Sequence, residues 1–320
     1  MCFVSFTCAL FLAATSSQAA SSGQSPASPA VASELLQSGK IAEARDAYEL
    51  VLNGNPADTD AQHGEVAASE RLALDARRSG KMDDALKDLL RAQAFAPKDP
   101  RLLYDLGILE DEMRLYRDAD KTLANAEQLQ PSNPQILYAV ARVKMDLGQL
   151  AAAEEKMQGY LKLAPNDAGA HYGMGRIFQL GLQFDRARDE FQRSIELQPV
   201  QTEAYYELGD IALGQGNLDD AIAYFNKTLA RDPKHGGALA GEGQACFKQK
   251  RYAQAEDFLE RAVAAAPEYQ AGHYYLGLTL ARLGRREDSQ RELELAAKLA
   301  AEESKKERSG LHILSPAMNP

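Results

Sequence analysis

Small and apolar residues return to the same positions of the chain every 34 residues. Six prolines mark the period: Pro97, Pro131, Pro165, Pro199, Pro233 and Pro267. Twelve residues before each proline is an alanine: Ala85, Ala119, Ala153, Ala187, Ala221 and Ala255. Eight residues before each is a larger apolar residue: Leu89, Leu123, Met157, Phe191, Phe225 and Leu259. A fixed period of this length is typical of repeat architectures, in which each repeat stacks on the next.

Each period predicts two helices. Ten residues after the prolines is a column of residues small enough to let two helix backbones approach closely: Gly107, Ala141, Gly175, Gly209, Gly243 and Gly277. A second column of glycines falls in the turn between the helices, where a positive φ is cheap only for glycine: Gly39, Gly80, Gly148, Gly216 and Gly284. The prolines end the second helix, and Asp99 and Asn133, each followed by proline, are predicted N-caps of the next first helix.

The register predicts about eight helix pairs. Six regular repeats begin at Pro100, Pro134, Ala168, Thr202, Gly236 and Gln270, and a shorter one covers residues 28–56. The repeat at residues 57–99 is seven residues longer, which is nearly two helical turns, so we expect one lengthened helix there. The last hairpin has Ser289 in the alanine column and no closing proline, as expected of a polar capping helix. The repeats would thus fill residues 28–303, with a C-terminal tail at 304–320.

The stretch GDIALGQGNLDDA at residues 209–221 resembles a phosphate or metal site, with three glycines followed by two aspartates. The repeat register assigns structural roles to most of these residues. Gly209 belongs to the close-packing column and Gly216 to the turn column, while Asp219 and Asp220 fall in the first turn of a helix, where negative charge suits the helix dipole. Gly214 fits no column. The register therefore favours a structural interpretation of this stretch.

The pattern resembles the tetratricopeptide repeat family. The resemblance is carried by AYYELG at residues 204–209, followed by Gly216, Leu218, Ala221, Phe225 and Pro233, and it extends over residues 28–303. It implies an all-α fold, in which antiparallel helix pairs stack into a right-handed solenoid with a concave groove. It also implies that the protein acts by binding other proteins, usually through short peptide segments.

Composition narrows the choice of partner and chemistry. The 320 residues include 46 acidic and 36 basic ones, for a net charge of −10, which argues against a nucleic-acid partner. The five histidines are scattered, and beyond the first residues the only cysteine is Cys246, so we expect no metal site and no cofactor. The repeats take up nearly the whole chain and bring no catalytic set together, so we expect no catalytic residues and no enzyme activity.

The first residues differ from the rest. MCFVSFTCALFLAATSSQAA carries no charge, and its apolar run is about 13 residues long, too short to span a bilayer. Ser17 and Ala19 have the spacing of a signal-peptidase site. We expect a signal peptide at residues 1–19 and a flexible leader at 20–27. The mature chain would then be exported, periplasmic or secreted, and would have no transmembrane segment. A buried N-terminal strand is the alternative.

The resemblance places the ligand-binding groove on one face of the first helices. Seven, eleven and fourteen residues after the prolines, that face carries the candidate partner-binding residues Tyr104, Tyr138, Arg142, Tyr172, Arg176, Tyr206, Asp210, Phe247 and Tyr274. Arg142 and Arg176 would form a cationic step able to hold a carboxylate. Asp210, at the same offset in the next repeat, would give this face a negative charge instead. The tyrosines either pack between neighbouring helices or also contact a ligand.

Two further hypotheses follow from this register. Glu110 and Lys144 occupy an offset that is apolar in the other repeats, and we expect them to form an ion pair between repeats, with a ligand site as the alternative. The leading functional hypothesis is a non-enzymatic scaffold that binds an extended peptide segment, in envelope assembly or secretion. The alternative is a glycan- or polymer-binding module that stacks its ligand on the tyrosines. Glycan binding that survives loss of Arg142 and Arg176 but fails on loss of the tyrosines would favour that alternative.

Overall fold

The computed structural model describes residues 28–313, with side chains described up to Lys305. The expected signal peptide at 1–19, the leader at 20–27 and the end of the tail at 314–320 lie outside the described residues. The described chain folds into sixteen α-helices and no strand, which confirms the all-α prediction. The first helices of the six regular repeats begin at the six residues that the period predicts.

The helices alternate between first and second members of a hairpin. The first helices are α1 (Pro29–Gln37), α3 (Thr59–Arg78), α5 (Pro100–Glu112), α7 (Pro134–Asp146), α9 (Ala168–Leu180), α11 (Thr202–Gly214), α13 (Gly236–Lys248) and α15 (Gln270–Arg282). The second helices are α2 (Ile41–Gly54), α4 (Met82–Phe95), α6 (Tyr116–Leu129), α8 (Leu150–Leu163), α10 (Phe184–Leu197), α12 (Leu218–Leu229), α14 (Tyr252–Ala265) and α16 (Arg286–Ile313).

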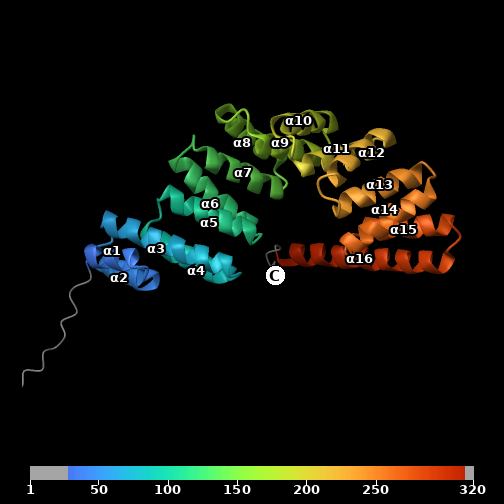
Figure 1. Ribbon diagram of the computed structural model, residues 1–320. Coiled ribbons are helices and arrows are strands. Elements are labelled where there is room, and N and C mark those ends of the chain that lie inside the picture. The colour runs from blue at the N-terminus through green and yellow to red at the C-terminus, as the bar shows by residue number, and fades with distance from the viewer. Residues whose placement is uncertain (1–27, 314–320) are drawn as a thin grey trace, which may run out of the picture. The chain divides into compact units, whose positions relative to one another are not determined.

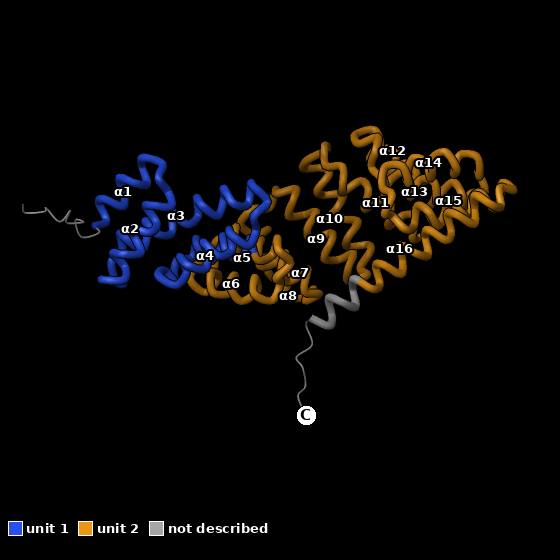
Figure 2. Tube along the Cα trace, turned by 90° about the horizontal axis from the view of Figure 1, so that it is seen from below, with its two compact units in different colours: residues 1–109 blue, residues 110–320 orange. Residues whose placement is uncertain are grey.

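The chain divides into two compact units, one ending at Leu109 and the other starting at Glu110, so the boundary falls inside α5 (Figure 2). In the first unit, α2 packs against both α1 and α3, and α3 packs against α4. In the second unit, each hairpin packs on the next from α6 to α16. Within this second unit, α7, α9 and α11 lie on the inner side of the row of hairpins and α8, α10 and α12 on the outer side (Figure 1).

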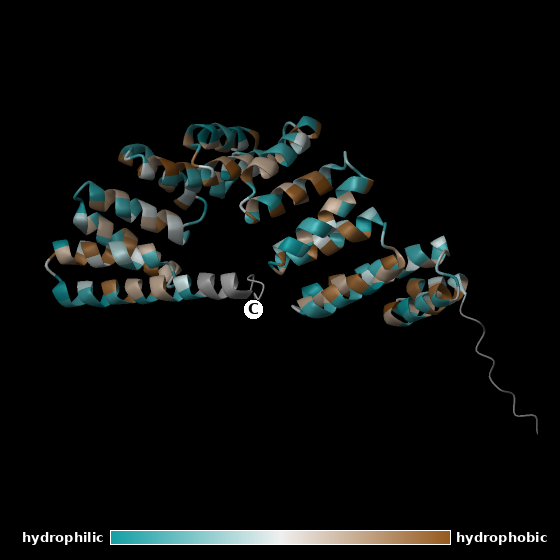
Figure 3. Ribbon diagram, turned by 180° about the vertical axis from the view of Figure 1, so that it is seen from behind, coloured by the Kyte–Doolittle hydropathy of each residue, from teal (hydrophilic) through white to brown (hydrophobic). Residues whose placement is uncertain are grey.

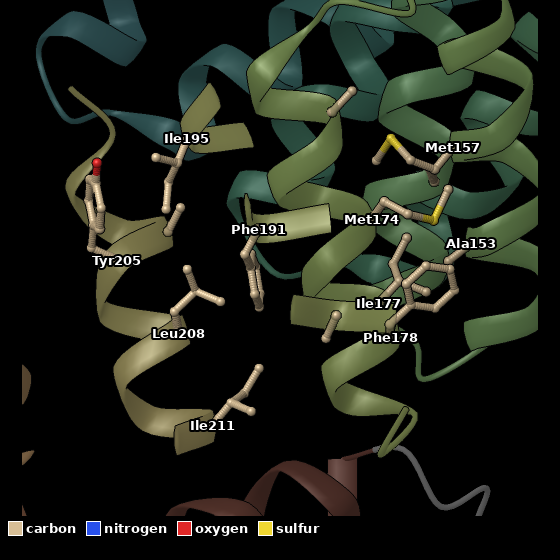
Figure 4. Close-up of a cluster of buried hydrophobic side chains, with 14 residues drawn as sticks. Ala153, Met157, Met174, Ile177, Phe178, Phe191, Ile195, Tyr205, Leu208 and Ile211 are labelled. Atoms are coloured by element: carbon tan, nitrogen blue, oxygen red, sulfur yellow. The ribbon is translucent and has the colours of Figure 1, made fainter. Parts of the chain in front are cut away.

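Close contact between the two helices of a hairpin builds the core of the second unit. A Cβ added to Gly209 of α11 would lie 2.6 Å from a ring carbon of Phe225 on α12, and one added to Gly175 would lie 2.6 Å from the ring of Phe191. Both rings are fully buried. Figure 4 shows Phe191 between residues of α9 and α11 in one buried cluster, with Leu208 on the α11 side. At these two positions, the glycine of the first helix leaves room for the phenylalanine ring of the second helix.

The turns within the hairpins need a left-handed residue. Gly39, Gly80, Gly148, Gly216 and Gly284 have φ between 71° and 84°. The equivalent position is a non-glycine residue in the other three hairpins: Arg114 (φ 60°), Leu182 (φ 57°) and Lys250 (φ 64°). A side chain in this region costs roughly 1–2 kcal/mol. The backbone geometry thus repeats even where the sequence column is broken.

The two irregular repeats differ in length. α3 has 20 residues, the lengthened helix that the seven extra residues predict. α16 has 28 residues and continues through residue 303, so the expected start of a separate tail at 304 falls inside a helix. Ser289 and Ala296 are the buried residues of α16 among those whose side chains are described. Its largely exposed surface fits a capping helix.

Two glycines on α11 give a matched test of this packing. We expect Gly209→Ala to destabilise the fold by roughly 1–3 kcal/mol, because the added methyl overlaps the buried ring of Phe225. At Gly214 a Cβ meets nothing within 4 Å, so Gly214→Ala should be neutral or stabilise the helix by up to about 1 kcal/mol. Urea unfolding followed by circular dichroism measures both variants. Equal midpoints for Gly209→Ala and the wild type would contradict the packing assignment.

Candidate functional site

The residues 7, 11 and 14 positions after the prolines of the second unit share one face of their helices, which we call the first-helix surface. It carries Tyr138 and Arg142 on α7, Tyr172 and Arg176 on α9, Tyr206 and Asp210 on α11, Phe247 on α13 and Tyr274 on α15. Tyr104 lies in the part of α5 that belongs to the first unit, where it is half-buried. Eight of the nine candidate residues therefore lie on the first-helix surface, within the second unit.

Hydrogen bonds join three pairs of neighbouring first helices at this surface. Arg142 on α7 donates to Asp111 at the end of α5, and Arg176 on α9 donates to Glu207 on α11. The amide of Gln244 on α13 donates to the Tyr275 hydroxyl on α15, at 2.7 Å. In each case the two partners are 31 residues apart in sequence. This spacing is about one helical turn shorter than the 34-residue repeat. Residues at this spacing therefore face each other on adjacent first helices.

The tyrosines of the surface pack against aromatic rings, as the first of the two interpretations expects. Tyr138 makes an edge contact with Tyr160 at 5.3 Å between centroids, and Tyr172 lies 5.6 Å from Phe191. Burial raises the pKa of Tyr172 to about 12, so its phenol stays neutral. Tyr274 is different, because 42% of its surface is exposed.

Two other aromatic residues of the surface share this packing. Tyr206 lies 6.2 Å from the ring of Phe225 and 4.8 Å from the ring of His235. Burial raises the pKa of Tyr206 as well. Phe247 is half-buried and packs near Tyr252 and Tyr275. These side chains hold neighbouring helices together while leaving part of their surface accessible.

Both arginines of the expected cationic step have partners within the chain. Both arginines are already bonded to carboxylates of their own chain, Arg142 to Asp111 and Arg176 to Glu207. Asp111 is 6% exposed and Glu207 is 4% exposed, so each needs a cationic partner to offset its lost hydration. The guanidinium groups therefore stabilise buried carboxylates of their own chain. The 31-residue spacing of charged residues was the signal in the sequence that would have found these pairs.

The first helices also carry carboxylates on or beside this surface that have no buried cationic partner. Asp146 on α7 and Asp210 on α11 form no ion pair among the described residues, and the Glu203 side chain is 60% exposed beside His235. Protein atoms crowd the Asp210 carboxyl even though it reaches solvent. This burial, together with the charge of Glu207, raises the pKa of Asp210. A positive charge placed beside Asp210 would therefore be stabilised.

A pocket of about 300 Å³ opens at the C-terminal end of α11. It is lined by Phe184, Asp210, Ile211, Leu213, Gly214, Gln215, Gln244 and Lys248. Gly214, the glycine that fits no repeat column, forms part of the wall. The Lys248 ammonium lies 3.3 Å from the Leu213 carbonyl oxygen, to which it donates. Sequence reasoning missed this pocket because its lining comes from three helices, α10, α11 and α13.

Glu110 and Lys144 do not form the expected pair. The Lys144 ammonium bonds to Asp120 at 2.7 Å and to Gln149 at 3.0 Å, on the second helix of the preceding repeat and in its own hairpin turn. Glu110 is buried and bonds to Thr122, and burial raises the pKa of its carboxyl. The two residues share an offset in the repeat, but instead of pairing with each other both bond to residues of α6, Lys144 to Asp120 and Glu110 to Thr122.

The described residues contain no group of three or more His, Cys, Asp or Glu side chains able to hold a metal ion. Cys246 is buried between α13 and its neighbours, and burial raises the pKa of its thiol. Within residues 28–313, no helix is long and apolar enough to cross a membrane.

Comparison with protein families agrees with this architecture. One tetratricopeptide repeat model matches residues 104–168 and 172–236, and a second matches residues 212–273. The chain belongs to the tetratricopeptide repeat family. No curated protein matches it. The fold of this family is that of protein–protein interaction scaffolds, which are generally non-catalytic, and it indicates protein partners.

Solved structures share the fold at low sequence identity. A tetratricopeptide repeat protein from Parabacteroides merdae gives a TM-score of 0.60 at 18% identity, over 73% of this chain and 93% of its own. PilW, a type IV pilus biogenesis factor, gives 0.60 at 19% identity, over 67% and 98%. A chain of the APC/C hetero-tetramer Cut9-Hcn1 gives 0.61 at 15% identity, over 85% and 52%. Identities this low establish similarity of fold alone.

The ion pair of Arg176 can be tested through stability. We expect Arg176→Ala to lower the free energy of unfolding by roughly 1–3 kcal/mol, because Glu207 stays buried without its cation. Adding Glu207→Gln should recover part of that loss. The control is Arg188→Ala on α10, whose partners Asp185 and Gln215 are exposed, with an expected change within about 0.5 kcal/mol. Urea unfolding of all four proteins measures these differences, and equal midpoints for Arg176→Ala and Arg188→Ala would contradict the assignment.

Proposed function

We propose that this protein binds an extended peptide segment of a partner protein along the first-helix surface. The observation that carries the proposal is the pocket at the end of α11, because Asp210 belongs both to its wall and to the row of residues on that surface. A segment lying across the first helices would contact partly exposed tyrosines and place a side chain in the pocket. Tyrosine is a residue that supplies large contact area at low entropic cost.

A peptide fits this surface better than a glycan does. Stacking of sugars needs aromatic ring faces that are open to solvent. The rings of Tyr138, Tyr172 and Tyr206 already lie against other rings of the protein, and Tyr274 alone of the four is classed as exposed. The carboxylates, amides and apolar wall of the pocket offer instead the mixed contacts that peptide side chains make.

We also propose that the protein is exported and serves at the cell envelope or outside the cell. The support is the uncharged apolar run at residues 2–14, followed by small residues at Ser17 and Ala19. PilW is a pilus biogenesis factor with the same fold, but at 19% identity this likeness adds no weight to a shared role.

Export has a direct test. Mass spectrometry of the protein recovered from cells that express the full chain should give a mature N-terminus near Ala20, because the signal peptidase would remove residues 1–19. Protein found in the soluble cytoplasmic fraction with an intact N-terminal segment would contradict export.

The binding surface can be mapped without knowing the partner. Random 15-residue peptides selected against the mature chain would be resynthesised with a photoreactive phenylalanine analogue and cross-linked to it. We expect cross-links on α7, α9, α11 and α13, because these helices carry the surface. Cross-links confined to α8, α10, α12 and α14 would show that the outer side binds, and failure to select any peptide would count against the proposal.

A further inference from the structure

The turn between α9 and α10 exposes three apolar side chains. Leu180 is 49% exposed, Leu182 is 73% exposed and Phe184 is 38% exposed. Leu182 also has a left-handed backbone, with φ of 57°, where five of the other hairpins have glycine and two have Arg114 and Lys250. An exposed leucine in a strained conformation stabilises neither the turn nor a core. Such an outlier points to a functional reason for the residue.

The apolar turn is continuous with the pocket at the end of α11. Phe184, two residues after Leu182, forms one wall of the pocket, and Ile211, Leu213 and Gly214 form the apolar part of the others. The single carboxylate in the lining is that of Asp210, which forms no ion pair among the described residues. The one cation in the lining, Lys248, is bonded to the Leu213 carbonyl oxygen. The pocket thus combines apolar and polar walls with a carboxylate that forms no ion pair among the described residues.

The chain is acidic overall, with a net charge of −10. Glu203, on the same helix as Asp210, has an exposed side chain. Arg176, the cation on α9 that acts on Asp210, is bonded to the buried Glu207. A net negative charge attracts cationic segments and repels acidic ones.

We propose that the pocket binds a lysine or arginine side chain of the partner segment, and that a neighbouring apolar residue of that segment packs on Leu182. The methylene groups of the basic residue would lie against Phe184 and Leu213, and its cationic end would pair with Asp210. Long basic side chains bind in this way, with an apolar stem and a charged tip. This inference rests on the proposed function and adds to it a positive charge on the ligand. From the sequence, Arg142 and Arg176 suggested a ligand with a negative charge.

The test uses the peptides selected against the mature chain. Peptides that cross-link to α11 or α13 should carry Lys or Arg next to Leu, Ile, Met or Phe. Replacing that Lys by norleucine, which keeps the stem and removes the charge, should raise Kd about tenfold, as isothermal titration calorimetry would measure. In Asp210→Asn the Kd for the lysine peptide should rise by a similar factor, and the difference between the lysine and norleucine peptides should vanish. The control Asp189→Asn removes an exposed carboxylate on α10 and should leave Kd within about twofold.

The turn offers a second pair of variants. Leu182→Gly should raise the melting temperature, because glycine fits the left-handed turn, and should nevertheless raise Kd at least fivefold. Lys250→Gly changes the equivalent position of another hairpin, so it should raise the melting temperature similarly and leave Kd unchanged.

The outcomes separate this inference from the proposed function. Peptides that cross-link to the first helices without a basic residue, or whose Kd is insensitive to Asp210→Asn, would overturn the inference and leave the proposed function standing. Selection of acidic peptides at this surface would also overturn it. Cross-links confined to the second helices would overturn both.

Discussion

The second unit depends on how closely the two helices of each hairpin approach each other. That distance is set where a glycine of the first helix faces a large side chain of the second, as Gly175 faces Phe191 and Gly209 faces Phe225. The ring fills the space that a Cβ would take, and both rings are fully buried. Because this packing recurs with the 34-residue period, equivalent positions of successive first helices fall on one surface. The candidate binding residues lie on that surface only because this packing repeats.

The same register decides which charges are available for binding. Facing positions on adjacent first helices are 31 residues apart, and charged residues at that spacing bond to each other, as Asp111 does with Arg142 and Arg176 with Glu207. These bonds stabilise the stack and offset part of the charge that the two arginines would present to a ligand. Beside them lies the pocket at the end of α11, with the carboxylate of Asp210 in its wall. The protein's stability and its choice of partner are therefore coupled through the same side chains.

Function in this family is a property of the surface, since the fold is shared by proteins whose sequences differ almost everywhere. The structures of PilW and of Cut9-Hcn1 share the fold of this chain at below 20% identity, so the fold alone does not determine which partner is bound. Leu182 is a surface position: five of the equivalent turns have glycine there, and the exposed leucine is the residue that we propose contacts the partner segment.

The sequence by itself determined the helix pairs, their starting residues, the packing glycines and the row of tyrosines, because a strict period imposes the same local environment in every repeat. It also indicated which face of the first helices is shared. Only the tertiary structure showed that Arg142 and Arg176 are bonded within the chain, that Lys144 pairs with Asp120 instead of Glu110, and that Phe184, Asp210 and Lys248 line one pocket. A period fixes where each side chain starts on its helix. Which of several nearby partners it reaches depends on side-chain length, burial and competing charges from three helices at once, and these are set in space.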